Sequence, residues 1–464
     1  MKPLRSRVLL LLPLIFILAA CTSGTPQTPL TKPAVTATKS RVPASPTGAV
    51  SSLQVSDEAL RDLTIELWHP WFQGVEASLL ESMVDEFNQK NQWGIQVALT
   101  GQINYSYLYE NVTTALPTPR RPDLVIALPE QARAWSGDGY VADLTPYLDD
   151  PIYGWDADQR QDFPSAFLAQ DTAGAARLGL PAQRSARFLL WNKTWAGELG
   201  FDSPPRTPED FHLQSCRAHQ AMLADATPDN DGLGGWIIDS DSMTAFSWLL
   251  AFEGGVLEGQ DYRFLTPNNI TAFKFVKSLQ EEGCAWQEPS GQDATEAFAA
   301  RGGLFATAGL EQFPDQVRAF SAAGNSDEWV PLPFPGKDQD ALVIYGSSFV
   351  VLDSTDEEQL ASWLFIRWML EGETDARWAK ATGLFPLRGS SIDLLGSYAV
   401  SHPQWAAAVE LMPQGQIQPQ LASWRTVKVM LGDGFDCMFR GTPQCLQAPV
   451  ILSQMEAISH DLSE

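Results

Sequence analysis

Basic residues are scarce in this chain. Its 464 residues include 31 Lys and Arg against 56 Asp and Glu, which gives a formal net charge of −25. A surface of this charge repels the phosphates of nucleic acids and of anionic lipids, and no basic cluster interrupts the sequence. We therefore expect neither a nucleic-acid partner nor a charge-driven attachment to membranes.

Motifs that carry catalytic or metal chemistry are also missing. The five His and five Cys form no C-x-x-C, H-x-x-x-H or H-E-x-x-H spacing of the kind that holds zinc. The run Gly346-Ser347-Ser348 lacks the last glycine of a nucleophile elbow, and residues 226–232 lack two ligands of a calcium loop. We expect no metal, no cofactor and no enzymatic activity.

A single apolar run near the start predicts export. Three basic residues precede the apolar run of residues 8–20. This run is shorter than the roughly 20 residues of a membrane span, and it leads into the sequence Leu18-Ala19-Ala20-Cys21. This is typical of a lipoprotein signal peptide, residues 1–20, followed by an acylated Cys21; an ordinary signal peptide with a chance cysteine is the alternative. Cleavage would remove three basic residues and lower the net charge from −25 to −28.

Residues 21–58 follow as a segment of Thr, Pro, Ser, Ala and Gly with almost no large apolar side chain. Such a composition buries too little surface to fold, so we expect a disordered tether. Its prolines favour an extended spacer between membrane and globular part.

Four cysteines remain beyond Cys21, an even number that suggests disulfides in an exported protein. Three pairings are open. Cys437 and Cys445 bracket a short turn and favour a bridge that closes this loop, which leaves Cys216 for Cys284.

Alternating strand and helix signals begin at residue 64. Strands are expected at residues 64–68, 94–99 and 123–128, with helices at residues 76–90 and 105–116 between them. This order predicts a doubly wound α/β sheet, in which ligands bind beyond the carboxyl ends of the strands. Those ends carry His69, Trp71, Gln102 and Glu130.

Three spaced segments carry a family resemblance. Residues 178–211 contain a Gly-Leu-Pro turn, an apolar strand that ends in Trp191-Asn192-Lys193, and Pro204-Pro205 before a helix start at Thr207. The segments Gly139–Leu148 and Gly383–Arg388 fit the same pattern. Together they resemble extracellular solute-binding proteins of ABC importers, of the family 1 type that binds maltose and other sugars.

The resemblance implies a two-lobed fold of the type II periplasmic-binding-protein class, in which each lobe is a helix-wrapped sheet. Three crossings between the lobes are expected near Pro181, Gly309 and Asp353. Residues 59–181 and 309–353 are assigned to the N-terminal lobe, and residues 182–308 and 354–464 to the C-terminal lobe.

The implied function is that of a lipid-anchored, monomeric receptor on the extracytoplasmic face of the cell membrane, which closes around a small molecule and delivers it to ABC permease subunits. Strand ends and resemblance together give the candidate ligand contacts: His69, Trp71, Gln102, Glu130, Gln183, Trp236, Glu253, Glu311, Tyr345, Ser347 and Arg388. Sixteen Trp favour stacking on sugar rings, hence a carbohydrate ligand. A polyamine ranks second, and a glycerophosphate lower because few arginines stand near the strand ends.

Two other classes of protein share parts of this pattern. A sensory binding protein would present its closed form to a receptor kinase instead of a permease. A secreted glycoside hydrolase would use a carboxylate pair, for which Glu130, Glu253 and Glu311 are the candidates.

Overall fold

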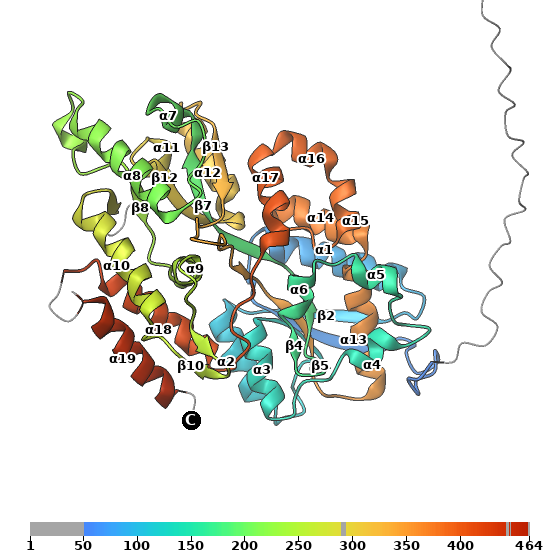
Figure 1. The fold of residues 1–464 in the computed structure, drawn as a ribbon. Coiled ribbons are helices and arrows are strands. Elements are labelled where there is room, and N and C mark those ends of the chain that lie inside the picture. The colour runs from blue at the N-terminus through green and yellow to red at the C-terminus, as the bar shows by residue number, and fades with distance from the viewer. Residues whose placement is uncertain (1–50, 289–293, 442–444, 446, 463–464) are drawn as a thin grey trace, which may run out of the picture. The chain divides into compact units, whose positions relative to one another are not determined.

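The computed structural model describes residues 51–288, 294–441, 445 and 447–462. These residues belong to one compact unit, residues 49–464, which contains two α/β lobes (Figure 1). Among the described helices, none has both the length and the apolar character needed to cross a membrane. The predicted signal peptide and Cys21 lie outside the described residues.

The first lobe is built on a five-stranded sheet. Its strand order is β2 (Gln96–Gly101), β1 (Thr64–His69), β3 (Leu124–Ala127), β15 (Ser348–Val351) and β6 (Leu180–Pro181). β1 pairs in parallel with β2 and β3, whereas β15 runs antiparallel to β3 and β6. All four residues of β3 are buried, as expected for a central strand covered on both faces.

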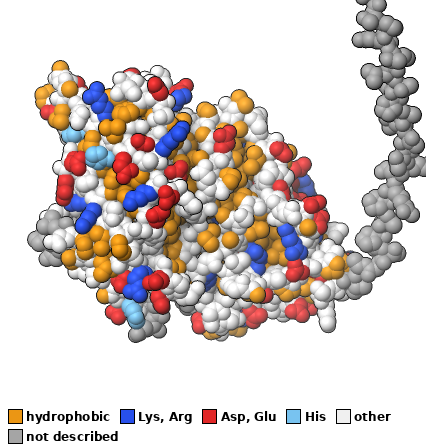
Figure 2. Space-filling view, in the orientation of Figure 1, with side chains coloured by type: hydrophobic (Ala, Val, Ile, Leu, Met, Phe, Trp, Pro, Cys, Tyr) orange, Lys and Arg blue, Asp and Glu red, His pale blue; other side chains and the backbone are white. Residues whose placement is uncertain are grey.

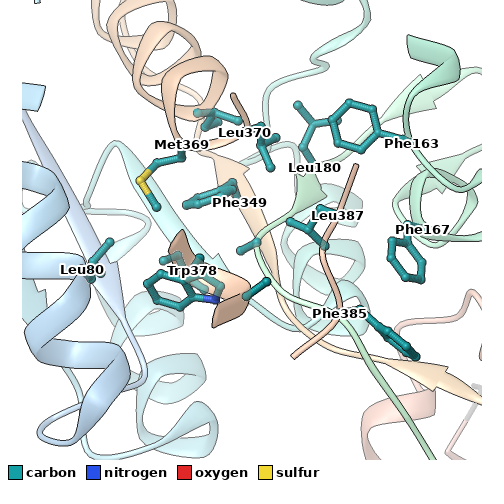
Figure 3. Packing of buried hydrophobic residues seen from close by; sticks show 14 of the residues in the cluster. Leu80, Phe163, Phe167, Leu180, Phe349, Met369, Leu370, Trp378, Phe385 and Leu387 are labelled. Carbon is teal, nitrogen blue, oxygen red and sulfur yellow. The ribbon is translucent and has the colours of Figure 1, made fainter. Parts of the chain in front are cut away.

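Helices cover this sheet because their apolar residues recur at helical spacing. The helix α1 (Val75–Lys90) buries Leu80, Met83, Val84 and Phe87, which share one face. Figure 3 shows Leu80 in the same cluster as Phe349 of β15, Met369 of α13 and Trp378 of α14. The other helices of this lobe are α2 (Tyr105–Ala115), α3 (Pro129–Gly137), α4 (Thr145–Asp149), α5 (Ala157–Gln161), α6 (Ser165–Ala169), α13 (Asp356–Met369), α14 (Gly372–Thr382), α15 (Gly389–Leu394) and α16 (Gly396–Ser401). The next helix, α17 (Pro403–Leu411), contacts α16 and also β13 (Trp329–Leu332) of the second sheet.

The second lobe is built on a six-stranded sheet. Its order is β11 (Ala285–Gln287), β8 (Trp236–Ile238), β12 (Phe305–Gly309), β7 (Ser185–Asn192) and β13 (Trp329–Leu332), and β14 (Ile344–Tyr345) also pairs with β7. Every residue of β7 is buried. The strand continues directly into α7 (Lys193–Glu198), whose first turn is capped by the Asn192 side chain accepting the Trp195 N–H at 2.9 Å.

The helices of the second lobe are α8 (Pro208–Leu223), α9 (Ser242–Ala251), α10 (Pro267–Glu281), α11 (Ala294–Ala299), α12 (Phe313–Ala322), α18 (Trp424–Cys437) and α19 (Ala448–Asp461). Two short hairpins, β4–β5 (Thr172–Ala173, Ala176–Arg177) and β9–β10 (Leu257–Glu258, Asp261–Tyr262), and three 3₁₀ turns, η1 (Pro228–Asn230), η2 (Leu310–Gln312) and η3 (Met412–Gln414), complete the described elements. In Figure 1, α10, α18 and α19 lie together at one side of the molecule.

The chain passes between the two lobes three times: from β6 to β7, from β14 to β15, and after α16 through α17 and residues 412–423 to α18. The first two passages lie against each other. Gly346 has φ 146°, and a Cβ there would clash with the carbonyl oxygen of Gln183. Only glycine permits this close approach of the two crossing segments.

The structure corrects the predicted lobe boundaries. The chain does not leave the second lobe near Gly309, because α12 packs against α11 and β13 then pairs with β7 in the second sheet. Likewise α13, which was assigned to the C-terminal lobe, contacts β1 and β15 of the first sheet. Local hydrophobic patterns specify a strand or a helix, but they do not specify which of two sheets it joins.

Part of the predicted tether is described and contacts the folded unit. The backbone N–H of Ser52 donates to Asp150 at 2.8 Å, and the Tyr153 hydroxyl donates to Asp57 at 3.0 Å. Residues 51–58 therefore pack against the first lobe.

Acidic and basic side chains are interspersed over the face of the molecule shown in Figure 2.

Two disulfides are present in the described residues, and they join the pairs that the sequence favoured. Cys216 and Cys284 have Cα atoms 4.4 Å apart, and the Cα atoms of Cys437 and Cys445 are 5.1 Å apart. Both separations lie in the normal range for a disulfide.

Candidate functional site

A cavity of about 430 Å³ is lined by residues from both lobes and from the crossing segments. The first lobe contributes Glu76, Tyr105, Leu128 and Glu130; the crossings contribute Gln183, Arg184, Ser185, Arg187, Tyr345, Gly346 and Gln418; Asp241, Ser242, Met243, Glu311, Leu384 and Lys428 complete the lining. The cavity thus lies where the sheet ends of the two lobes face each other.

Helix starts bring much of this lining into place. Glu76, Tyr105 and Glu130 lie in the first turns of α1, α2 and α3, and Ser242 begins α9. These helices follow β1, β2, β3 and β8, so the carboxyl ends of the parallel strands deliver the side chains.

Glu311 lies at one wall of the cavity, where two hydroxyl groups donate hydrogen bonds to its carboxylate. Its carboxylate accepts hydrogen bonds from the Ser185 hydroxyl at 2.6 Å and from the Tyr345 hydroxyl at 2.8 Å. Burial, followed by the charge of Glu311, raises the pKa of Tyr345 well above its usual value. The phenol therefore stays protonated and acts as a donor at neutral pH.

Two basic side chains of the cavity are already paired. Lys428 forms an ion pair with Glu130, and Arg187 forms one with Asp239. Arg187 also donates from Nε to the Thr244 hydroxyl at 3.0 Å.

Carboxylates are left in excess around the cavity. Among the residues that the structure describes, no ion pair involves Glu76, Asp241 or Glu311. The cavity therefore offers hydrogen-bond acceptors and negative charge.

A buried ion pair fixes the crossing segments below the cavity. Arg184 is fully buried and donates to Asp171 at 2.6 Å and to the carbonyl of Ser347 at 2.6 Å. Asp171 also accepts from the Ser348 hydroxyl at 2.5 Å. Because both crossings bond to one guanidinium, the cavity floor is held at a fixed geometry.

The structure brings four of the sequence-predicted contacts to the cavity: Glu130, Gln183, Glu311 and Tyr345. Ser347 is buried beside them, and its carbonyl holds Arg184. These residues come from four separate parts of the chain, yet they meet at one site.

Three predicted contacts belong to other environments. Trp236 is fully buried in the second-lobe core, where its indole N–H donates to Thr307 at 3.0 Å. The Arg388 guanidinium lies 4.2 Å from the ring centre of Phe163 and donates to the Leu370 carbonyl. Glu253 is exposed at the end of α9 and does not line the cavity.

The remaining three predicted contacts lie near the first-lobe strand ends but outside the cavity lining. His69 is buried, which lowers its pKa to about 4, and its ring packs 5.8 Å from that of Trp71. Trp71 in turn packs 5.4 Å from Trp378, and Gln102 accepts from Asn111 at 2.6 Å. His69 and Trp71 thus belong to an aromatic cluster with Trp378, and Gln102 is bonded to α2.

Several lining residues were missed from the sequence. Tyr105 follows the strand expected at residues 94–99, so the strand-end rule could have found it, whereas Asp241 follows β8, a strand that was not expected from the sequence. Lys428 lies in the middle of α18 and reaches the cavity only through tertiary packing. No local signal marks it.

The model of the bacterial extracellular solute-binding protein family matches residues 82–413. The chain belongs to this family. Solved structures of similar fold include the sugar-binding protein MalE from Xanthomonas citri, with a TM-score of 0.73 and 18% identity over 86% of this chain and 97% of that one. The cyclic α-maltosyl-1,6-maltose binding protein from Arthrobacter globiformis has a TM-score of 0.70 and 20% identity, covering 86% and 99% of the two chains.

UgpB from Mycobacterium tuberculosis, solved in complex with glycerophosphocholine, has the same fold with a TM-score of 0.67 and 16% identity, covering 86% of this chain and 98% of that one. The fold therefore occurs in proteins that bind different solutes. Membership of the family makes this chain a binding protein by descent, and the two-lobed α/β architecture expected from the sequence is confirmed.

Proposed function

We propose that this protein is an extracytoplasmic receptor that binds a carbohydrate between its lobes and delivers it to the permease subunits of an ABC transporter. The observation that carries the proposal is a cavity lined by both lobes and by the crossing segments, where the starts of α1, α2, α3 and α9 meet. A solute bound there contacts both lobes at once, and such contacts stabilise the closed arrangement only.

The chemistry of the lining suits an uncharged polyol. The carboxylates of Glu76, Asp241 and Glu311 accept hydrogen bonds from sugar hydroxyls, and the Gln183 amide donates and accepts. Tyr105 and Tyr345 supply aromatic rings that can stack on the apolar face of a pyranose. No described Trp lines the cavity, so the tyrosines take the part that the sequence assigned to tryptophan.

Lipid attachment at Cys21 completes the proposal. A diacylated thiol and an acylated amine provide the two or more chains that stable anchoring requires. The tether between Cys21 and residue 51 would then keep the receptor at the membrane, within reach of a permease.

A cationic solute is the second candidate, because Glu76, Asp241 and Glu311 lie around the cavity without a basic partner in the described residues. Carboxylates and tyrosine rings together bind ammonium groups. A polyamine fits this requirement, and so does the cationic end of a glycerophosphodiester.

The test is calorimetry of the mature chain against mono- and oligosaccharides, polyamines, amino acids and glycerophosphodiesters. We expect saturable binding of a carbohydrate. Glu311→Gln should weaken it by at least about tenfold, since a hydrogen bond to a charged group contributes about 1.5–3 kcal/mol. Glu253→Gln is the matched control, because Glu253 lies outside the cavity lining and should leave the affinity unchanged.

Binding restricted to polyamines, weakened by Glu311→Gln, would replace the carbohydrate with the second candidate. Equal effects of Glu311→Gln and Glu253→Gln would remove the cavity as the binding site. Release of shortened products from an oligosaccharide would instead support the glycoside hydrolase reading.

A further inference from the structure

Four side chains with metal-ligating atoms meet on the second lobe, away from the solute cavity. They are His212, Cys216, Glu282 and Cys284, and one ligand atom of each lies within 4.8 Å of the others. None of the four lines the cavity. Among the described residues, no second group of three or more such side chains has this geometry.

Two rigid elements present these side chains to each other. His212 and Cys216 are one helical turn apart on α8, so they share a face. Glu282 caps the end of α10, and Cys284 directly precedes β11. Gly283, which lies between Glu282 and Cys284 in the chain, has φ 75°, and a Cβ at this position would clash with the ring of His219.

The contacts within the group already resemble a ligand shell. His212 Nε2 lies 2.7 Å from Glu282 Oε2 and 3.6 Å from Cys216 Sγ. Cys216 Sγ lies 3.9 Å from the same Glu282 oxygen. The Cys284 residue is 3% exposed, whereas the His212 and Glu282 side chains are 36% and 51% exposed, which leaves a path for an ion from solvent.

We propose that reduction of the Cys216–Cys284 disulfide turns this group into a zinc site whose ligands are the two thiolates, His212 and Glu282. A tetrahedral zinc with bonds of about 2.0–2.3 Å places its ligand atoms roughly 3.3–3.8 Å apart. The separations from Cys216 to His212 and Glu282 are close to this range. The two sulfurs must move apart after reduction, and the His212–Glu282 contact must widen by less than about 1 Å.

The reaction balances with a dithiol as the reductant. The dithiol gives two electrons and two protons and becomes a disulfide, while the S–S bond of Cys216–Cys284 breaks into two thiols. Zinc then replaces both thiol protons, which pass to solvent. Soft sulfur ligands with one imidazole and one carboxylate favour zinc over calcium or magnesium, which prefer oxygen ligands.

The second disulfide provides an internal comparison. Cys437 and Cys445 are also bridged, but the metal-binding group of described residues does not include them. Reduction of the Cys437–Cys445 bridge gives two thiols that have no His and Glu ligands beside them among the described residues. The proposal therefore predicts different outcomes for two disulfides of one chain.

The experiment uses the mature chain with Cys21→Ser, so that the thiol of residue 21 binds no metal. The protein is reduced without oxygen, and Co²⁺ is titrated while thiolate-to-cobalt charge-transfer absorption is measured. Zinc affinity is then measured by competition with a coloured chelator. We expect one metal per chain in the reduced protein and none in the oxidised protein.

The variants separate the proposed site from simple thiol binding. His212→Ala and Glu282→Gln should each lower zinc affinity by more than about tenfold while the number of free thiols stays unchanged. The double variant Cys437→Ser/Cys445→Ser should bind zinc as the parent does. Equal zinc binding by a Cys216→Ser/Cys284→Ser variant, or no uptake by the reduced parent, would overturn the proposal.

Discussion

Burial decides what individual charged residues do in this protein. Asp375 is 2% exposed, and its Oδ2 accepts backbone N–H groups of Leu387 at 2.8 Å and Arg388 at 3.2 Å. Burial is the largest influence on this carboxyl and raises its pKa to about 6 from an ordinary 3.8. The folded protein therefore holds a proton at Asp375 more tightly than the unfolded chain does.

This shift has a definite sign for stability. The stabilisation is fully present below the unfolded pKa and is lost as pH rises through the folded pKa. Relative to Asp375→Asn, which is uncharged at all pH values, the free energy of unfolding of the wild type should fall by up to about 3 kcal/mol between pH 4 and pH 7. Denaturant titrations of both proteins at each pH measure this free energy of unfolding.

Asp433→Asn, at an exposed position, is the control and should follow the wild type at every pH. Asp123 also has a pKa raised to about 6. Because the wild type and both variants contain Asp123, its contribution cancels when their free energies of unfolding are compared. Parallel curves for wild type and Asp375→Asn would show that Asp375 titrates normally.

The same residue-level physics separates the predicted contacts that line the cavity from those that lie elsewhere. Glu130 and Glu311 were found because strand ends and crossing positions can be read along the chain. Trp236 and Arg388 have the same residue types as ligand contacts, but one is fully buried in the core and the other is held by aromatic rings and a carbonyl. Sequence alone does not distinguish a buried side chain from one at a cavity wall.

At the scale of elements, α18 links the lobes. Its Lys428 pairs with Glu130 of α3, and its Arg425 lies 4.5 Å from the ring centre of Tyr109 in α2. Glu130 is 3% exposed, so its carboxylate depends on this partner. Removing Lys428 leaves this buried carboxylate without its basic partner, which destabilises the arrangement of the lobes that buries it.

Lys428→Met should therefore increase the radius of gyration of the ligand-free protein, measured by small-angle X-ray scattering, and weaken solute binding. Lys193→Met removes a similar ion pair, with Glu328, that lies within the second lobe and is exposed. This control should keep the radius of the parent. An unchanged radius for Lys428→Met would show that the pair does not hold the lobes together.

Elements themselves were largely predictable, and their partners were not. The strand β7 and the caps at Asn192 and Thr207 follow from apolar runs and capping residues, which are local signals. Assignment of β13 and α13 to lobes failed because that choice depends on packing between segments far apart in the chain. Lys428 was missed for the same reason.

At the scale of the whole molecule, the proposed position at the membrane depends on Cys21. Cys21→Ala should abolish lipid attachment, because the acylated thiol is lost. Detergent phase partitioning of cell extracts checks this: wild-type protein should enter the detergent phase, and the variant should remain as precursor or appear in the aqueous phase. The variant should still bind solute, since the residues that line the cavity all lie between Glu76 and Lys428, far along the chain from Cys21. Mature Cys21→Ala protein in the detergent phase would contradict lipid attachment at this residue.

The position of β15 also affects how the protein is made. β15 lies between β3 and β6 in the first sheet, although more than 160 residues separate it from either strand in the chain. The ribosome therefore completes all six described strands of the second sheet before the first sheet receives its missing strand. A nascent chain that ends before residue 348 has an open edge on β3, so folding of the first lobe must wait until late in synthesis, and the incomplete chain stays dependent on factors that keep it from aggregating.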